Sequence, residues 1–139
     1  MKWDKMDRYT TLVYVKTRTS NLNNVEFNFD NKYEFHIVNE AELSCEYFLS
    51  VKKIKNPMPD NFWGKNISSL NVIAGKNGSG KTSFLKFIMN NIGEDITALY
   101  GEEVFYILRY GEKYLYATTL DDKELCIDSE LEQIGLEDL

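Results

Sequence analysis

The middle of the chain gathers glycines, lysines and a threonine in the stretch Gly75-Lys76-Asn77-Gly78-Ser79-Gly80-Lys81-Thr82. This spacing fits the pattern Gly-x-x-x-x-Gly-Lys-Ser/Thr, in which a glycine-rich loop wraps around phosphate groups. By average residue frequencies, the four fixed positions coincide by chance in roughly one chain in a few hundred of this length. The stretch therefore predicts a nucleotide-binding loop.

Each residue type in the loop has a chemical reason to be there. Glycines adopt positive φ at little steric cost, and they let backbone N–H groups approach the phosphate oxygens. The ammonium of Lys81 can reach the β- and γ-phosphates, the hydroxyl of Thr82 can bind Mg²⁺, and Ser83 offers a further hydroxyl near the α-phosphate. The predicted nucleotide site consists of Gly75, Lys76, Asn77, Gly78, Ser79, Gly80, Lys81, Thr82 and Ser83, with Thr82 as the metal ligand.

Such a loop needs a strand before it and a helix after it. The apolar run Ser69 to Ala74 predicts the strand, and residues 82–92 predict an amphipathic helix that Gly93 would end. The stripe expected to pack on the sheet beside the phosphate site consists of Phe84, Leu85, Ile88 and Ile92. Residues 69–93 are thus predicted to form a strand, a phosphate loop and a helix.

An antiparallel β-layer is predicted upstream of the loop, over residues 12–54. Apolar and polar residues alternate from Val25 to Phe29 and again from Tyr33 to Val38, which puts every second side chain toward a core. We expect these two runs to pair with each other across a hairpin turn at 30–32, with His36 on the outer face. Further strands are predicted at 11–16 and 43–54.

The segment downstream of the helix predicts a β-hairpin, because two apolar runs flank Tyr110-Gly111-Glu112. With a short further strand near 124–127, this region spans residues 104–128. The acidic tail at 129–139 has no basic residue. It is either a frayed, solvated end or a docking segment for a partner.

Composition limits the classes of protein to which the chain can belong. The 139 residues suffice for one domain, and they carry 22 acidic against 16 basic residues, a net charge of −6. That balance argues against binding of a nucleic-acid backbone by this segment alone. No apolar run approaches the ~20 residues that span a bilayer, and the N-terminus lacks the apolar core of a signal peptide. We expect a cytoplasmic protein with no direct nucleic-acid binding and no membrane association.

The two cysteines, Cys45 and Cys126, lie far apart in the sequence and lack metal-ligand spacing. Buried thiols in a reducing compartment are the favoured interpretation, and a disulfide is the alternative that stays open.

The chain resembles the N-terminal part of ABC-type ATPases of the SMC and RecF-like kind. The resemblance is carried by residues 66–74 leading into the Asn-Gly-Ser-Gly-Lys core of the loop and by Ser83-Phe84-Leu85 after it. It implies that residues 75–82 hold the phosphates of ATP and that Thr82 binds magnesium. The fold expected is α/β with α+β character: the N-terminal lobe of a P-loop NTPase, with an antiparallel β-layer, a P-loop strand and helix, and then a β-hairpin.

Two motifs of that family are missing from the sequence. ABC-type ATPases also use an apolar strand ending in Asp-Glu and a Ser-Gly-rich signature that caps ATP across a dimer. The nearest substitute, residues 117–122, reads as a strand end and turn, and Gln133 is the sole candidate for the family's magnesium-contacting glutamine. We therefore expect residues 1–139 to form a single, incomplete nucleotide-binding domain that needs a protein partner, self-association or further sequence to hydrolyse ATP.

Two other functions stay open at this point. In the first, the loop is degenerate and the β-layer with the acidic tail is a protein-interaction module. In the second, the chain is a small phosphotransferase that uses Asp121 or Asp122.

Overall fold

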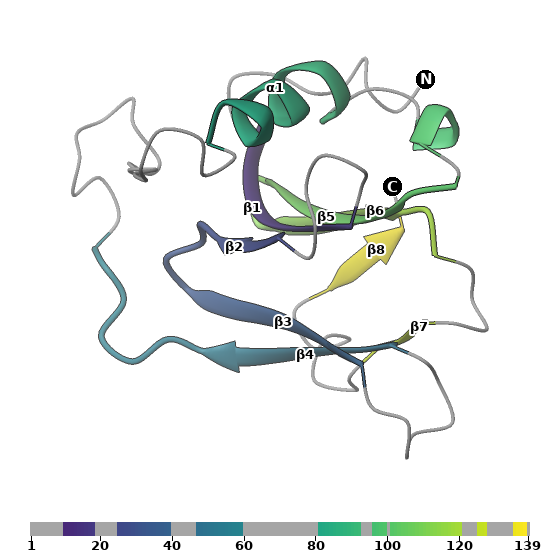
Figure 1. The fold of residues 1–139 in the computed structure, drawn as a ribbon. Coiled ribbons are helices and arrows are strands. Elements are labelled where there is room, and N and C mark those ends of the chain that lie inside the picture. Colours follow the sequence, from purple (N-terminus) through teal and green to yellow (C-terminus); the bar gives the residue numbers. More distant parts are fainter. Residues whose placement is uncertain are drawn as a thin grey trace.

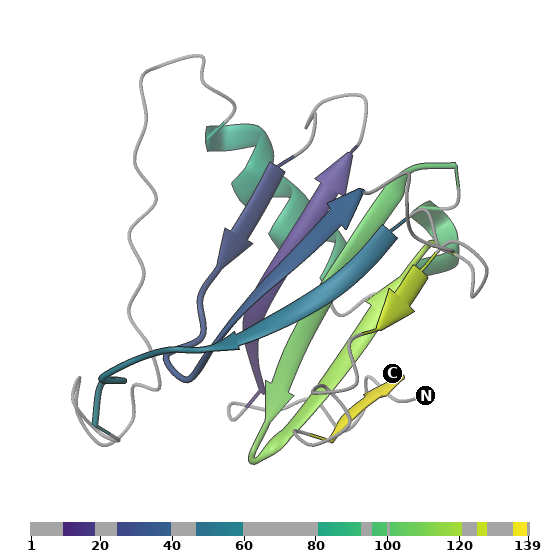
Figure 2. The ribbon, with the colours of Figure 1, turned by 90° about the horizontal axis from the view of Figure 1, so that it is seen from below.

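The computed structural model describes residues 10–18, 25–39, 47–59, 81–92, 96–99, 101–120, 125–127 and 135–138. These residues form three layers, with a helix above a larger sheet and a smaller sheet below it (Figure 1). Seen from below, β3 and β4 of the smaller sheet lie over β1 and β5 of the larger one (Figure 2). No helix among the described segments is long and apolar enough to cross a membrane.

The larger sheet has five strands in the order β2-β1-β5-β6-β8. Its members are β1 (Thr10–Arg18), β2 (Val25–Asn28), β5 (Glu103–Tyr110), β6 (Lys113–Thr118) and β8 (Leu136–Asp138). Neighbours are antiparallel except for β6 and β8, which run parallel. The last part of the predicted acidic tail is thus an edge strand, and Leu136 packs against the core between the sheets.

The smaller sheet has three strands in the order β3-β4-β7. They are β3 (Tyr33–Asn39), β4 (Tyr47–Lys53) and β7 (Leu125–Ile127), with β3 antiparallel and β7 parallel to β4. The predicted inward face of β3 is confirmed, because Phe35 and Ile37 are buried between the two sheets. His36, between them, has 57% of its side chain exposed, but its ring contacts Glu26 of the larger sheet.

Strand β5 occupies the middle of the larger sheet and is covered on both faces. Val104, Tyr106 and Leu108 face the helix, whereas Phe105 and Ile107 face the smaller sheet. A strand buried on both faces reads as a continuous apolar run, which is what the sequence shows here. The predicted hairpin to β6 is confirmed, and its two-residue turn places Gly111 at φ 61°, a conformation that glycine adopts readily.

Strand β1 contains a β-bulge at Val13. The register to β5 shifts between Leu12 and Tyr14, so Val13 and Tyr14 both reach the core between the sheets. The carbonyl oxygen of Val13 accepts a hydrogen bond of 2.8 Å from the backbone N–H of Phe29. The bulge therefore turns Tyr14 toward the smaller sheet, where its hydroxyl makes the contacts described below.

Helix α1 (Lys81–Asn91) packs on the outer face of the larger sheet through Phe84 and Phe87, and the short 3-10 helix η2 (Ile96–Leu99) follows it. The predicted apolar stripe was wrong in one member. Leu85 is 45% exposed, and Phe87 is buried in its place. Residues 84, 87 and 88 share one face at spacings of three and four, whereas position 85 is rotated about 100° from position 84.

The expected α/β fold of a P-loop NTPase lobe is contradicted. The described chain is mostly β-sheet, with one α-helix and two sheets. An α/β fold needs parallel strands joined by crossover helices, but here the long strands pair antiparallel, and the only parallel partners in the described part are the short strands β7 and β8. The strand predicted at Ser69 to Ala74 lies outside the described residues.

The expected pairing of the second and third strands is also wrong. Strand β2 pairs with β1 in the larger sheet, and β3 pairs with β4 in the smaller one. The predicted turn at 30–32 is therefore a corner at which the chain passes from one sheet to the other. The buried carboxylate of Asp30 holds this corner by accepting a hydrogen bond of 3.1 Å from the backbone N–H of Tyr33.

Candidate functional site

The described part of the predicted phosphate loop is its last section, Lys81, Thr82 and Ser83, which forms the start of α1. The glycines and their neighbours at 75–80 lie outside the described residues. Lys81 and Ser83 are half-buried, and Thr82 is exposed. The lysine and the two hydroxyl residues therefore stand together at the N-terminal end of a helix.

The position of this helix end depends on the apolar residues that follow it. Phe84 is 2% exposed and lies 4.5 Å, between ring centroids, from Phe27 of β2. Phe87, one turn later, is 8% exposed in the same cluster. Both rings hold the first turns of α1 against the larger sheet, so the backbone that carries Lys81 and Thr82 is fixed in position.

The electrostatics of this helix end suit an anion. Unpaired N–H groups give a helix N-terminus a partial positive charge, and the first turn of α1 contains no acidic side chain to offset it. Lys81 adds a full positive charge at the same end. Among the described residues no group of three or more His, Cys, Asp or Glu side chains could hold a metal ion.

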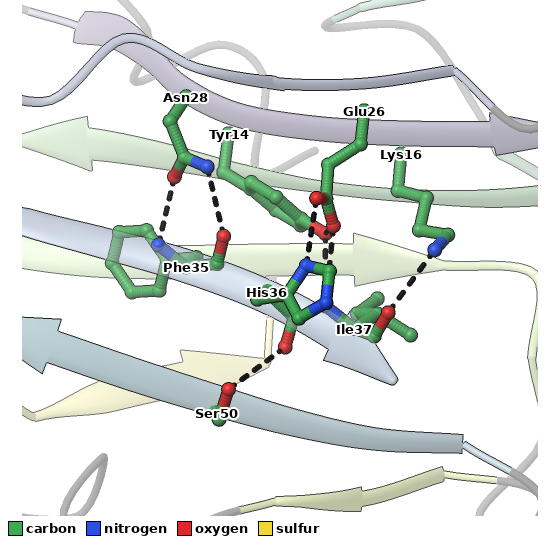
Figure 3. Close-up of polar contacts among 8 residues, drawn as sticks. All are labelled: Tyr14, Lys16, Glu26, Asn28, Phe35, His36, Ile37 and Ser50. Carbon is green, nitrogen blue, oxygen red and sulfur yellow. Dashed lines mark hydrogen bonds and ion pairs between the residues drawn. The ribbon is translucent and has the colours of Figure 1, made fainter. Parts of the chain in front are cut away.

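A second polar group lies between the two sheets and was not predicted (Figure 3). The carboxylate of Glu26 on β2 accepts a hydrogen bond of 2.5 Å from the hydroxyl of Tyr14, and its other oxygen lies 2.7 Å from Nδ1 of His36. The backbone N–H of Ile37 completes the set, at 3.3 Å from the carboxylate and 3.2 Å from the tyrosine oxygen. One carboxylate thus links β1, β2 and β3.

The order of these groups determines what they can do chemically. In a nucleophile–base arrangement the imidazole lies between a hydroxyl and a carboxylate, but here the carboxylate lies between the other two. Burial raises the pKa of Tyr14, and the hydrogen bond to Glu26 raises it further, so the hydroxyl stays protonated. The group joins the two sheets and does not form a hydroxyl–imidazole–carboxylate relay.

The pKa of Glu26 is lowered, although burial by itself would raise it. The hydrogen bonds from Tyr14, from His36 and from the N–H of Ile37 favour the charged carboxylate and outweigh burial. Glu26 is therefore ionised in the folded protein at neutral pH.

Side chains of the larger sheet also cover the free edge of β3 (Figure 3). The amide of Asn28 donates to the carbonyl of Phe35 at 2.8 Å and accepts from its N–H at 2.7 Å. The ammonium of Lys16 donates to the carbonyl of Ile37 at 3.0 Å. Because an uncovered strand edge can pair with another chain, these contacts block β3 from such pairing.

A third polar group lies at the opposite end of the sandwich, around the buried carboxylate of Asp30. One of its oxygens lies 2.8 Å from the guanidinium of Arg109, whose side chain is 15% exposed, and the other accepts from the hydroxyl of Tyr114 at 2.8 Å. Burial and the charge of Asp30 raise the pKa of Tyr114. Arg109 and Tyr114 both donate to Asp30 within the fold, which indicates a structural role.

A cavity lies between the sheets, where β1 and β3 end and β4 and β5 begin. Its volume is about 310 Å³. Charged and polar side chains that line it include Lys16, Arg18, His36, Tyr47 and Glu103, and Phe105 contributes an apolar wall. This site lies on the opposite face of the larger sheet from α1.

No protein-family model, curated protein or solved structure matches the chain. Its function must therefore be argued from its own residues.

The other predicted positions have mixed outcomes. Residues 117–120 form a strand end and a bend as expected, and Thr118 and Thr119 hydrogen-bond the backbone of Val104. Asp121, Asp122 and Gln133 lie outside the described residues. Cys126 on β7 is disulfide-bonded, so the favoured interpretation of free thiols is wrong for this residue. Cys45 is the only other cysteine in the sequence and lies outside the described residues.

Sequence reasoning missed the inter-sheet group and the cavity, because both combine side chains from strands that are distant in sequence. One signal was present in the polar face of β2. Glu26 and Asn28 alternate with apolar residues there and were expected to face solvent. Both can accept a hydrogen bond from the backbone N–H of a neighbouring strand edge, a role that neither a Lys nor an Ala could fill at these positions.

Proposed function

We propose that this chain binds Mg-ATP through residues 75–83 and acts as the ATP-binding segment of a larger ATP-dependent assembly. The observation that carries the proposal is the position of Lys81 as the first residue of α1. The motif requires its Lys-Thr pair to follow the glycine loop and to open a helix, and Lys81 and Thr82 meet the second requirement.

Each described residue then has a definite part in binding. The ammonium of Lys81 neutralises charge on the β- and γ-phosphates, and the exposed hydroxyl of Thr82 binds Mg²⁺. Ser83 supplies a hydroxyl near the α-phosphate. Phe84 and Phe87 contribute by fixing the helix end that bears all three residues.

Hydrolysis is proposed to need groups from outside this segment. The sequence contains the phosphate-binding residues but no apolar strand ending in Asp-Glu and no Ser-Gly-rich signature, so the groups that activate water come from a partner, a second copy or further sequence. A role that depends on ATP favours the cytoplasm. The disulfide at Cys126 points the other way, because disulfides persist mainly in oxidising compartments.

Calorimetric titration with Mg-ATP tests the nucleotide site. We expect binding by the wild-type chain and at least about tenfold weaker binding by Lys81→Ala, since a hydrogen-bonded charge is removed from a dense anion. The matched control is Lys86→Ala, an exposed lysine on the same helix that should leave affinity unchanged. Absence of binding at millimolar ATP, or equal affinity of the wild type and Lys81→Ala, would refute the proposal.

Turnover by the isolated chain is a separate measurement. We expect negligible ATP hydrolysis, because the sequence lacks the water-activating motif. Robust hydrolysis that is lost in Lys81→Ala would show that the catalytic acids lie within these residues after all.

A second candidate function is a protein-interaction module with a degenerate loop. It is favoured by the exposure of Leu85 (45%) and Met89 (81%), which lie one turn apart on α1. Light scattering at several concentrations, with and without Mg-ATP, separates the two candidates. Self-association that is independent of nucleotide and weakened by Leu85→Ser with Met89→Ser would favour the interaction module.

A further inference from the structure

The cavity between the sheets gathers positive charge on a chain that is acidic as a whole. Lys16 and Arg18 lie two residues apart on β1, so their side chains leave the same face of the strand and both line the cavity. The imidazole of His36 reaches it from β3. The only carboxylate among the described residues that line it is Glu103.

That carboxylate is already engaged with other cavity residues. One oxygen of Glu103 accepts a hydrogen bond of 3.0 Å from the hydroxyl of Tyr47, and the other lies 3.9 Å from the guanidinium of Arg18. Arg18 and Glu103 have 63% and 41% of their side chains exposed, so this long ion pair is weak.

Lys16 contributes a further positive charge, and the carboxylate of Glu26, its cross-strand partner on β2, is already engaged by Tyr14 and His36. The ammonium of Lys16 donates to the carbonyl oxygen of Ile37, a neutral acceptor, and the side chain is half-buried. An ammonium has three N–H donors, so two remain for a ligand after this bond is made. A neutral acceptor compensates only part of the free-energy cost of burying a cation, and a bound anion would offset the remaining charge.

The wall opposite these charges is apolar. Val38 and Leu120 are its half-buried apolar residues, and Ile37 and Phe105 lie nearly fully buried behind them. The volume of about 310 Å³ lies at the small end of the range in which proteins hold small organic ligands. A pocket with an apolar wall and a few converging charged groups recognises a molecule with one apolar side and one charged end.

We propose that this cavity binds a small organic anion whose carboxylate or phosphate is held by Lys16 and Arg18 and whose apolar body lies against Val38 and Leu120. The guanidinium fork suits either head group, because both present two oxygens in the required geometry. The site is separate from α1, since it lies on the other face of the larger sheet.

Amide chemical-shift titrations with four probes test the site. Benzoate and phenyl phosphate should each shift the amides of Ile37, Val38 and Phe105, and the tighter of the two identifies the preferred head group. Benzamide has the shape of benzoate without its charge, and inorganic phosphate has the charge without the ring. Both should bind at least about tenfold more weakly, because each lacks one half of the recognition.

Two variants assign the charge to its residues. Lys16→Met keeps the aliphatic stem and Arg18→Gln removes an exposed cation, and each should weaken binding of the better probe about tenfold or more. Lys113→Met, at an exposed position of the same sheet, should bind like the wild type. Arg18→Gln keeps the test decisive if Lys16→Met fails to fold, because the Arg18 side chain is largely exposed.

Several outcomes would overturn the proposal. They are equal affinity for benzamide and benzoate, unchanged binding in both Lys16→Met and Arg18→Gln, and absence of any shift at millimolar probe. Loss of probe binding in Lys81→Ala would also overturn it, by placing the anion at the phosphate loop. Conversely, Lys16→Met should bind Mg-ATP like the wild type, so the two proposals can fail separately.

Discussion

The carboxamide of Asn28 on β2 pairs with the backbone of Phe35 on β3 as another strand would, accepting from its N–H at 2.7 Å and donating to its carbonyl at 2.8 Å. The two strands belong to different sheets, so this side chain takes the place of a backbone ladder at the corner between them. It is the reason why β3 can follow β2 closely in sequence without pairing with it.

Replacing Asn28 should loosen this corner. We expect Asn28→Ala to lower the free energy of unfolding by about 1 kcal/mol, since two hydrogen bonds are lost but water can reach the partly exposed groups. Asn28→Asp keeps an acceptor for the N–H and loses the donor, so it should not restore stability. Urea denaturation measures the stability of both variants. The control is Ser50→Ala, which removes an exposed hydrogen bond to the carbonyl of His36 on β3. An unchanged midpoint for Asn28→Ala would contradict the role given to this amide.

The ion pair of Asp30 with Arg109 should be far more sensitive. Arg109→Met leaves the fully buried carboxylate without its cation, and breaking a buried pair in this way costs about 3–5 kcal/mol. The double variant Asp30→Asn with Arg109→Met removes the unpaired charge and should recover part of the loss. Thermal or urea unfolding of the two single variants and the double variant gives the coupling free energy between Asp30 and Arg109. Strict additivity of the single effects would show that the two residues do not interact.

Acid stability should depend on Glu26. Because its pKa is lower in the folded than in the unfolded state, the ionised carboxylate stabilises the fold above the ordinary value of 4.5, and this contribution is lost as the pH falls through the lowered pKa. Glu26→Gln should therefore flatten the fall of Tm between about pH 5 and pH 3. Glu34→Gln, on the exposed face of β3, is the control and should keep the wild-type slope. Parallel curves for the wild type and Glu26→Gln would contradict the assignment.

The two neighbouring apolar residues of α1 should respond very differently to truncation. Phe84→Ala opens a cavity between the helix and the larger sheet and should cost about 3–5 kcal/mol, whereas Leu85→Ala removes an exposed side chain and should stay within about 0.5 kcal/mol of the wild type. Denaturant unfolding of both variants is the measurement. Equal losses of stability in the two variants would support the apolar stripe predicted from the sequence, in which Leu85 packs on the sheet.

Local patterns predicted which residues face a core more reliably than which strands are neighbours. The alternation from Tyr33 to Ile37 correctly places Phe35 and Ile37 inward, and the Gly111 turn is correctly placed, because a side chain's direction and a two-residue turn depend on residues close in sequence. The pairing of β2 with β3 was wrong, since the choice of partner depends on contacts with β1 and β4. The bulge at Val13 gave no periodic signal and yet determines where Tyr14 points.

The sequence by itself determined the glycine and lysine spacing at 75–82, the helix after it and the inward faces of the main strands, because these properties depend on residue type and local period. Only the tertiary structure decided that the chain builds two mostly antiparallel sheets, that Phe87 is buried while Leu85 is exposed, and that Glu26 meets Tyr14 and His36. It also decided that Lys16 and Arg18 share a cavity with Phe105. These relationships join residues that are distant in sequence, and their energy comes from packing and hydrogen bonds that exist only once the sheets are stacked.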